Sequence, residues 1–393
     1  MYLVRFIIII LCVIPANSYA DNVLDEFSQL QKSSLLVVSE KGESVYSKNA
    51  DQLWVPASTV KLLTALMAID HWGRDYRFST QFFTDNKNNL IVKGFGDPFL
   101  VSEELDLIVN ELHALGINQI SGIAIDTSFF QDKIIVSGQG ASNNPYDAAV
   151  GALAANFNTV EVRVNKSGVT SGEPQTPITP LATALAKTLP AGKHRINLGK
   201  AEYSGLYFVE LLTAKLLAKN ISVLNENNIV SKNNPLKLLY THYNSRSLHQ
   251  VISAMLEYSN NFIANQLYLI MGAEKFGAPA TMNKSQQYAN DYIEQHFDWS
   301  SYLLADGAGL SRENRLSARQ LVEVLHNFTP HQDLMPIQNN QIFAKSGTMR
   351  GVSSYAGYLL ADKQALAFAM LINQPVRYRF REQLAVELLR QFE

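Results

Sequence analysis

The sequence predicts an α+β fold in which one antiparallel sheet is covered by helices and interrupted by an inserted, β-rich unit. Three observations support this prediction. Strand-like segments occur near both ends of the chain, apolar segments with helical periodicity dominate after residue 205, and residues from about 80 to 200 differ from both in composition. Because the end segments must pair to bury their apolar faces, we expect the two ends to meet in one sheet.

The first two strands of that sheet are predicted from residues 34–39 and 43–47, which flank a glycine-containing turn. A helix is predicted over residues 59–70. Pro56 stands just before this segment, and Leu, Met and Ile recur along it at helical spacing. Since nearly all of its positions are apolar, we expect this helix to be buried on most sides.

The inserted unit is predicted to consist mainly of short strands, with one helix-like stretch at residues 102–115. Its β-like pieces are residues 78–84, 89–93, 119–125 and 158–164. Gly, Pro, Asn and Thr are frequent between them. We therefore expect residues 81–200 to form an accessory domain, and residues 21–80 plus 201–393 to form the main domain.

The C-terminal part of the chain is predicted to supply most of the helices and the rest of the sheet. The expected helices are residues 205–219, 247–257, 261–273, 282–296 and 317–328. The expected strands are residues 341–346, 352–361 and 364–373. A last helix over residues 378–392 carries charges of mixed sign, so we expect it to pack on the sheet rather than on a membrane surface.

Residues 1–20 are typical of a secretory signal peptide. Arg5 is their only charge, nine apolar residues follow from Phe6 to Ile14, and the segment ends in the small-x-small pattern Ser18-Tyr19-Ala20. An uncleaved anchor is the alternative, but nine residues are too few to cross a bilayer, which takes about 20. We expect cleavage after Ala20, export, and at most a peripheral association with the membrane.

The composition excludes several classes of protein. Lys+Arg number 33 against 35 Asp+Glu, with no dense basic run, so a nucleic-acid binder is not expected. The single cysteine, Cys12, lies in the predicted signal peptide, which leaves no thiol for a disulfide, a nucleophile or a zinc site. The eight histidines form no His-Glu-x-x-His pattern, so a zinc peptidase is not expected.

Ser58 and Lys61 are the first residues that could carry out chemistry. Their Ser-x-x-Lys spacing at the start of a predicted helix places both side chains on one face. A serine hydroxyl becomes nucleophilic when a base takes its proton, and a lysine whose pKa is lowered by burial can be that base. A serine that caps the helix beside a solvated lysine would give the same Ser-x-x-Lys pattern. However, a lysine inside an apolar helix is otherwise costly.

Two further polar segments lie next to apolar elements. Residues 259–261, Ser-Asn-Asn, separate two predicted helices, where they either project into a cleft or cap the second helix. Residues 345–348, Lys-Ser-Gly-Thr, end a predicted strand. Their glycine permits close approach of a ligand, and the lysine and hydroxyls could hold a carboxylate. The alternative is a lysine that protects an edge strand.

Each of the three segments alone is weak evidence of function, but their order and spacing together are specific. Ser259 follows Ser58 by 201 residues, and Lys345 follows Ser259 by 86. In this arrangement the chain resembles the penicillin-recognising serine D,D-peptidases, and more narrowly the D-Ala-D-Ala carboxypeptidases (peptidase S13-like) of the class C low-molecular-mass penicillin-binding proteins. Segments 56–65, 94–98, 122–127 and 306–312 are also similar to that family. Ser346 and Ala308 depart from its commonest residues, threonine and serine.

The resemblance implies a beta-lactamase/transpeptidase-like domain with helices on both faces of the sheet. It also implies that Ser58 attacks the carbonyl of the terminal D-Ala-D-Ala bond, that Lys61 is the general base, and that Ser259 passes the proton to the leaving amine. The backbone N–H groups of Ser58 and Thr348 would form the oxyanion hole. No metal or other cofactor is implied.

Substrate binding is implied for residues of the second and third segments, namely Asn261, Lys345, Ser346, Gly347 and Thr348. Asn261 would hydrogen-bond the substrate and Lys61, while Lys345 and the two hydroxyls would hold the terminal carboxylate. The implied partners are peptidoglycan peptides and beta-lactam antibiotics, which would acylate Ser58 and leave slowly. Together with the predicted signal peptide, this implies a periplasmic location.

Two rival functions stay open. Residues 258–260, Tyr-Ser-Asn, look like the Tyr-x-Asn of one class of beta-lactamase, which would turn over a chromogenic cephalosporin rapidly. A non-catalytic cell-wall-binding module would not be acylated at all. The sequence does not separate carboxypeptidase from endopeptidase activity or give the oligomeric state. It also leaves open whether Asp306 and Arg312 touch the site or only fix a loop.

Overall fold

An antiparallel sheet with strands from both ends of the chain forms the centre of the main lobe, as the sequence predicts. It is seen in a computed structural model that describes residues 20–199, 201–226, 229, 231, 235–338, 340–361 and 364–392. The predicted signal peptide lies outside these residues, apart from Ala20. Within them the sheet has the strand order β12-β13-β14-β15-β1-β2. These strands are β1 (Ser33–Val38), β2 (Ser44–Lys48), β12 (Ile337–Gln338), β13 (Ile342–Met349), β14 (Val352–Ala361) and β15 (Gln364–Ile372).

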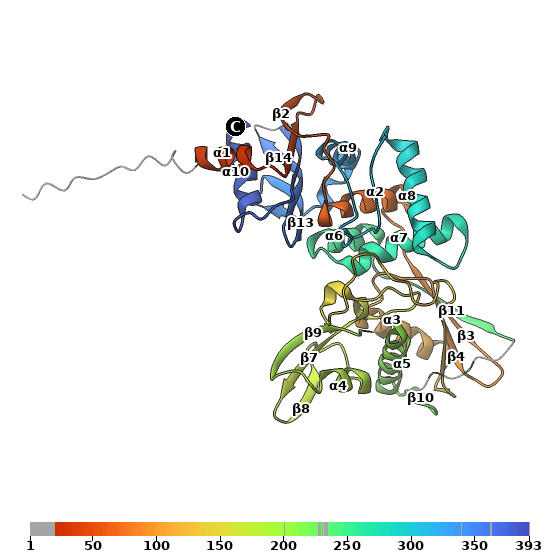
Figure 1. Cartoon of the computed structure of the whole chain (residues 1–393). Helices are drawn as coiled ribbons and strands as arrows, with labels where there is room; N and C mark the ends of the chain where they lie inside the picture. The colour runs from red at the N-terminus through yellow and green to blue at the C-terminus, as the bar shows by residue number, and fades with distance from the viewer. Residues whose placement is uncertain are drawn as a thin grey trace, which may run out of the picture.

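Helices cover both faces of this sheet, which explains why its central strands are apolar at nearly every position. On β15, Phe368 and Met370 face α1 (Ala20–Gln29) and α10 (Phe380–Phe392), which lie side by side in Figure 1. The alternate residues Ala369 and Leu371 belong to the core on the other face. The last helix therefore packs on the sheet, as expected from its mixed charges.

The other face of the sheet carries the helices of the main lobe. The apolar helix α2 (Val60–Trp72) contacts α9 (Ala318–Phe328) as well as α6 (Leu248–Glu257) and α7 (Asn261–Phe276), and α8 (Met282–His296) packs on α7. Ten consecutive residues of α2 are buried, so the prediction of a helix enclosed on most sides is confirmed. None of the described helices is long and apolar enough to span a membrane.

A second lobe with its own apolar core lies below the main lobe in Figure 1. One of its sheets has the order β11-β3-β4-β6 and another has the order β8-β7-β9. Its strands include β3 (Ser79–Thr84), β4 (Leu90–Gly94), β6 (Ile123–Asp126), β7 (Thr159–Asn165), β8 (Gly168–Ser171), β9 (Gly192–Asn197) and β11 (Lys237–Tyr243), and its helices α3 (Ser102–Ala114), α4 (Pro180–Ala186) and α5 (Ala201–Ala218). We call this part, residues 79–243, the accessory lobe.

The accessory lobe differs in detail from the predicted inserted unit. Residues 119–125 are divided between β5 (Gln119–Ile120) and β6, because a turn at Ser121 and Gly122 interrupts them. α5 lies beyond the expected boundary at residue 200, yet it buries Leu211 and Leu212 in the accessory core. The change in composition near residue 200 does not mark this packing, since α5 is as apolar as the helices of the main lobe.

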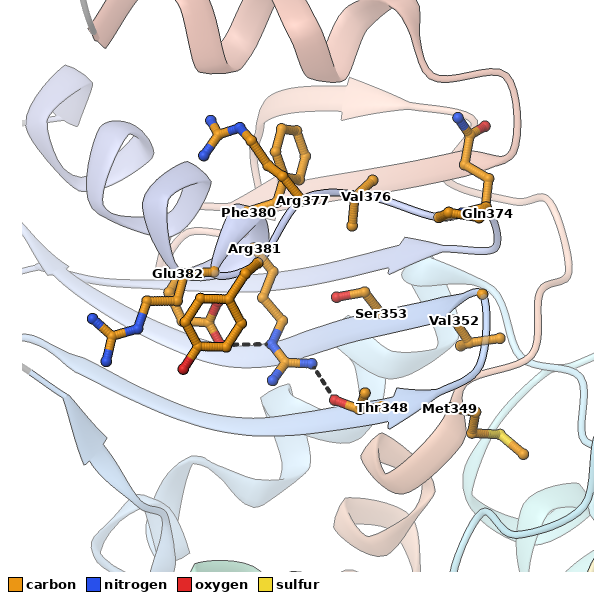
Figure 2. A pocket seen from close by; sticks show the side chains of 14 residues that line it. Thr348, Met349, Val352, Ser353, Gln374, Val376, Arg377, Phe380, Arg381 and Glu382 are labelled. Carbon is orange, nitrogen blue, oxygen red and sulfur yellow. Dashed lines mark hydrogen bonds and ion pairs between the residues drawn. The ribbon is translucent and has the colours of Figure 1, made fainter.

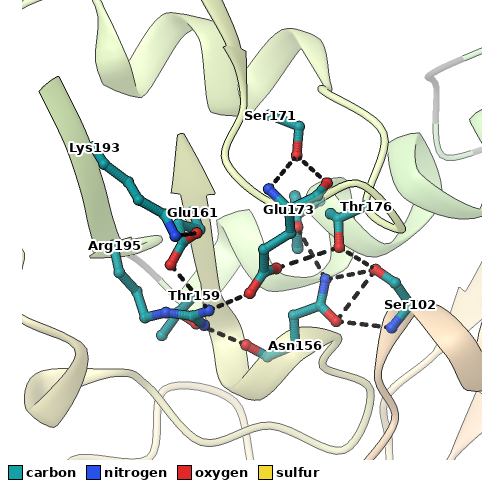
Figure 3. A network of polar contacts seen from close by, with 10 residues as sticks. Ser102, Asn156, Thr159, Glu161, Ser171, Glu173, Thr176, Lys193 and Arg195 are labelled. Atoms are coloured by element: carbon teal, nitrogen blue, oxygen red, sulfur yellow. Dashed lines mark hydrogen bonds and ion pairs between the residues drawn. The ribbon is translucent and has the colours of Figure 1, made fainter. Parts of the chain in front are cut away.

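A polar network fixes the segment of the accessory lobe that faces the main lobe (Figure 3). Asn156, Phe157 and Asn158 all have left-handed φ values, between 51° and 59°, a conformation that asparagine tolerates but that is costly for phenylalanine. The Asn156 side chain accepts a hydrogen bond from the Ser102 amide at 2.8 Å. The Asn158 side chain donates to the carbonyl of Ala149, also at 2.8 Å. These side-chain contacts stabilise the unusual backbone from both sides.

The buried central strand of the main sheet gives a test of the fold. We expect Ile372→Ala to lower the free energy of unfolding by about 2–5 kcal/mol, because Ile372 is fully buried and its truncation leaves a cavity. Ile135 is 81% exposed, so Ile135→Ala should change stability by less than about 0.5 kcal/mol. Urea unfolding followed by fluorescence measures both variants. Equal effects would contradict the assigned core.

Candidate active site

Ser58 lies in a short 3₁₀ turn, η2 (Ala57–Thr59), that leads directly into α2. The sheet holds this turn in place. The carbonyl of Pro56 accepts hydrogen bonds from the hydroxyls of Thr59 at 2.7 Å and Ser354 at 2.6 Å. Just before it, the Asn373 side chain bonds both the amide and the carbonyl of Val55, at 3.0 and 3.1 Å. The serine is therefore presented on a rigid support.

Two glycines press against this turn from opposite segments. A Cβ atom added to Gly347 would lie 2.8 Å from the Ser58 nitrogen and would also clash with Ser354 Oγ. One added to Gly309 would lie 3.0 Å from the same nitrogen and would overlap the carbonyl of Ala57. Gly309 also has a φ of 79°, which favours glycine. Only glycine allows strand β13 and the loop at residues 306–312 to approach Ser58 this closely.

Lys61 is fully buried one turn after Ser58, and its amine contacts three oxygens. Nζ lies 3.0 Å from Ser58 Oγ, 2.7 Å from Asn261 Oδ1 and 2.6 Å from the carbonyl oxygen of Ala308. Burial lowers the pKa of Lys61 well below its usual value, and the nearby charge of Lys345 lowers it further, while Asp306 opposes the shift. This environment favours a neutral amine that can accept the Ser58 proton.

The start of α7 brings Asn261 to the same point. Asn260 caps the helix, since its side chain accepts a hydrogen bond from the Ile263 amide at 3.1 Å. Asn261 therefore occupies the first helical turn, where its Nδ2 donates to the carbonyl of Tyr146 in the accessory lobe at 3.2 Å. Ser259 precedes it in the turn between α6 and α7, partly exposed and with a φ of 51°. Within this segment Asn260 therefore caps the helix, and the neighbouring Asn261 contacts Lys61.

Lys345 is also buried, with 2% of its surface exposed, so it does not protect an edge strand by facing solvent. Its Nζ donates to the carbonyl of Ser346 at 2.9 Å. Burial and the neighbouring charge of Arg381 lower the pKa of Lys345 to about 8, and Glu257 opposes this shift. On the same strand, Ser346 is partly exposed and Thr348 is exposed.

Asp306 fixes the loop that contacts Lys61. Its carboxylate accepts hydrogen bonds from three backbone amides and from Asn314 Nδ2, all at 2.7–3.0 Å. Thr64 of α2 donates to the carbonyl of Gly307 at 2.7 Å, which holds the loop on that helix. Arg312 reaches the turn after β13 and donates to the carbonyl of Arg350 at 2.6 Å. Both side chains thus connect loop segments around the site.

Sequence reasoning missed Arg381, which α10 brings to the end of β13. Its Nη1 donates to the hydroxyl of Thr348 at 2.7 Å (Figure 2). The same nitrogen donates to the carbonyl of Gly347 at 2.8 Å. This arginine was expected only as one of the charges of a helix packed on the sheet, because more than 30 residues separate it from the Lys-Ser-Gly-Thr segment. The carbonyl groups of Ala308 and Tyr146 were missed too, since backbone oxygens carry no residue pattern. In the described part of the chain, no group of three or more His, Cys, Asp or Glu side chains could hold a metal ion.

This arrangement agrees with comparisons to known proteins. Residues 18–190 and 190–341 match the D-Ala-D-Ala carboxypeptidase 3 (S13) family. The chain belongs to this family. The resemblance in the sequence is thereby confirmed, and with it a serine-type D-Ala-D-Ala carboxypeptidase on a transpeptidase-like fold.

Individual relatives of this S13 peptidase are distant but extend over most of its length. It is 24% identical to the D-alanyl-D-alanine carboxypeptidase of Actinomadura sp. (strain R39), covering 90% of this chain and 80% of that protein. Penicillin binding protein 4 (dacB) from Haemophilus influenzae superposes with a TM-score of 0.74 at 21% identity, covering 94% and 99%. The same protein complexed with a beta-lactam superposes with a TM-score of 0.69 at 21% identity, covering 94% of this chain and 98% of that chain. The peptidoglycan endopeptidase Bd3459 from Bdellovibrio bacteriovorus gives 0.54 at 16% identity, covering 92% of each chain.

The role of Asp306 in holding the loop can be tested by removing its carboxylate. We expect Asp306→Ala to destabilise the S13 peptidase by about 3–5 kcal/mol, because several buried donors lose their acceptor. Asp298 is exposed, so Asp298→Ala serves as the matched control with a change of less than about 0.5 kcal/mol. Denaturant unfolding measures both, and an Asp306→Ala protein as stable as the control would exclude the structural role.

Proposed function

We propose that this chain is a secreted D,D-peptidase that cleaves D-Ala-D-Ala bonds of peptidoglycan peptides, and cross-link bonds of the same chemistry, through an acyl-enzyme on Ser58. The observation that carries the proposal is the buried amine of Lys61, 3.0 Å from Ser58 Oγ and held by Asn261. A lysine in this position can take the serine proton because burial lowers its pKa.

Acylation begins when Lys61 accepts the proton of Ser58 and Oγ attacks the carbonyl carbon of the scissile bond. The negative charge that develops on the carbonyl oxygen is stabilised by the backbone N–H groups of Ser58 and Thr348. Ser259 then passes this proton from Lys61 to the leaving nitrogen, the C–N bond breaks, and Lys61 is again a neutral amine. The D-alanine departs as the free amine, and the acyl group remains as an ester on Ser58.

Deacylation reverses the roles of the same groups. A water molecule loses a proton to Lys61 and attacks the ester carbonyl, the oxyanion is held as before, and Ser58 leaves with a proton returned to its oxygen. Asn261, bonded to both Lys61 and Tyr146, orients the amine through both steps and binds the substrate amide. No step requires a metal or another cofactor.

Substrate recognition falls to strand β13. Lys345, Ser346 and Thr348 would hold the terminal carboxylate, and Gly347 leaves room for the substrate backbone to approach the strand. A beta-lactam carries a carboxylate and an acylating carbonyl in a similar relation, and the similar Haemophilus influenzae protein is known in complex with one. We therefore infer that beta-lactams acylate Ser58 in this chain as well.

The location and domain division are part of the same proposal. Residues 1–20 would direct export to the periplasm and be removed after Ala20.

The main domain would carry the reaction and the accessory lobe would form a separate domain. The pairing of β3 with β11 favours limits near residues 79 and 243 over limits at 81 and 200, since these strands open and close the lobe.

Intact-mass spectrometry after incubation with benzylpenicillin tests the acyl-enzyme. We expect one adduct on the wild-type protein and on the control Ser300→Ala, an exposed serine, and none on Ser58→Ala. An adduct on Ser58→Ala would exclude this nucleophile. Rapid consumption of penicillin without an adduct would indicate a beta-lactamase. Neither adduct nor consumption would indicate a non-catalytic binding module.

The pH dependence of turnover tests the carboxylate contact of Lys345. The pKa of Lys345 is lowered to about 8, so its charge is present below that pH and lost above it. We expect kcat/KM for a D-Ala-D-Ala peptide to fall as pH rises through about 8. Lys345→Arg should move this decline to higher pH, because a guanidinium stays charged. An unmoved decline would exclude Lys345 as its cause.

A further inference from the structure

A pocket of about 350 Å³ opens beside Thr348, on the side of β13 that faces α10. Figure 2 shows it between the β13–β14 hairpin and the segment that leads into α10, with the Arg381 side chain crossing toward Thr348. Its lining contains three arginines of that segment, Arg377, Arg379 and Arg381. The pocket therefore begins where the Lys-Ser-Gly-Thr strand segment ends.

The pocket carries an excess of positive charge. Glu382 is the only acidic residue of its lining, and it pairs with Nε of Arg381 at 2.8 Å. Arg377 is paired outside the pocket with Glu26 at 3.1 Å. Arg379 lies over the ring of the exposed Tyr378 and forms no ion pair with any residue the structure describes. The lining therefore includes one arginine that has no ion-pair partner among the described residues.

Arg381 has donors left for such an anion. Its Nη1 bonds Gly347 and Thr348, its Nε bonds Glu382, and its Nη2 donates to no described residue. The side chain is held rigidly, since only 16% of its surface is exposed. A fixed guanidinium with a free pair of N–H groups is well suited to a carboxylate.

The direction of the substrate follows from the proposed function, on which this inference rests. The carbonyl carbon lies at Ser58 Oγ, and the carboxylate at Lys345, Ser346 and Thr348 belongs to the residue that leaves as the amine. Arg381 bonds the same Thr348 hydroxyl at 2.7 Å. The space beyond Thr348 and Arg381 therefore continues on the leaving-group side of the scissile bond.

We propose that this pocket is the subsite for the leaving amine. Arg381 is its specificity-determining residue and donates through Nη2 to the leaving carboxylate. The room bordered by Arg379 takes leaving groups larger than D-alanine, namely amines of a second peptide that carries further carboxylates. The pocket thus provides for cleavage of cross-links as well as for release of a terminal D-alanine.

The first experiment compares two leaving groups on one acyl donor. Wild type, Arg381→Gln and Arg381→Lys are assayed with an acyl-D-Ala-D-Ala peptide and with a thioester of the same acyl group whose leaving thiol is uncharged. We expect Arg381→Gln to lower kcat/KM for the peptide about 10–100-fold, as the loss of a charge-assisted hydrogen bond does, and to change the thioester less than about 3-fold. The kcat/KM of Arg381→Lys for the peptide should lie between the values of wild type and Arg381→Gln. Lysine keeps the positive charge but lacks the paired N–H groups of a guanidinium.

The outcomes separate this inference from the proposed function. If Arg381→Gln lowered kcat/KM equally for the peptide and the thioester, Arg381 would only position Thr348. This result would overturn the leaving-group role while the peptidase assignment stands. A wild-type protein that forms no penicillin adduct and cleaves neither substrate would overturn the proposed function itself. Unchanged thermal unfolding of both variants establishes that the losses do not reflect misfolding.

The second experiment tests the larger leaving group with a cross-linked peptide dimer and the uncross-linked pentapeptide. We expect Arg379→Gln to lower turnover of the dimer about 3–10-fold, through the loss of one partly screened charge contact, and to leave the pentapeptide unaffected. Arg163→Gln removes an exposed arginine of the accessory lobe and serves as the control, with no change on either substrate. Equal rates for Arg379→Gln and the control on the dimer would exclude the extended pocket.

Discussion

The amine of Lys61 joins three segments of the main lobe, and the arrangement of the site depends on it. The three oxygens that it contacts come from the Ser58 turn, from the first turn of α7 and from the loop at residues 306–312. A buried lysine without partners would cost several kcal/mol, so the site is stable only when all three segments are in place. The same helices build the apolar core of the lobe, which couples the geometry of the site to folding.

Three basic side chains, Arg381, Lys345 and Lys61, follow one another from the pocket beside Thr348 to Ser58. The pKa of Lys345 is lowered to about 8, and that of Lys61 is lowered well below its usual value. Each lowers the pKa of the next, since Arg381 acts on Lys345 and Lys345 acts on Lys61. Permanent charge for binding and a neutral base for chemistry are thus obtained from neighbouring side chains.

The sequence predicted the features that local pattern determines. The strands at both ends, helix α2 and the helix starts at residues 102, 261 and 282 were placed within three residues, because apolar periodicity and capping residues mark them. It also selected Ser58, Lys61 and Asn261, which the structure brings into hydrogen-bonding contact. The helix α4, strands β9 and β11, and the contacts of Arg381 were not predicted, since long-range packing and not local periodicity determines them.

Glycine on both sides of the Ser58 turn limits how this protein can change over evolutionary time. Added bulk at Gly309 or Gly347 would push on the nitrogen and carbonyl groups that present Ser58. A lineage that substitutes either glycine therefore displaces Ser58 as well, whereas positions that do not contact this turn can vary without moving it.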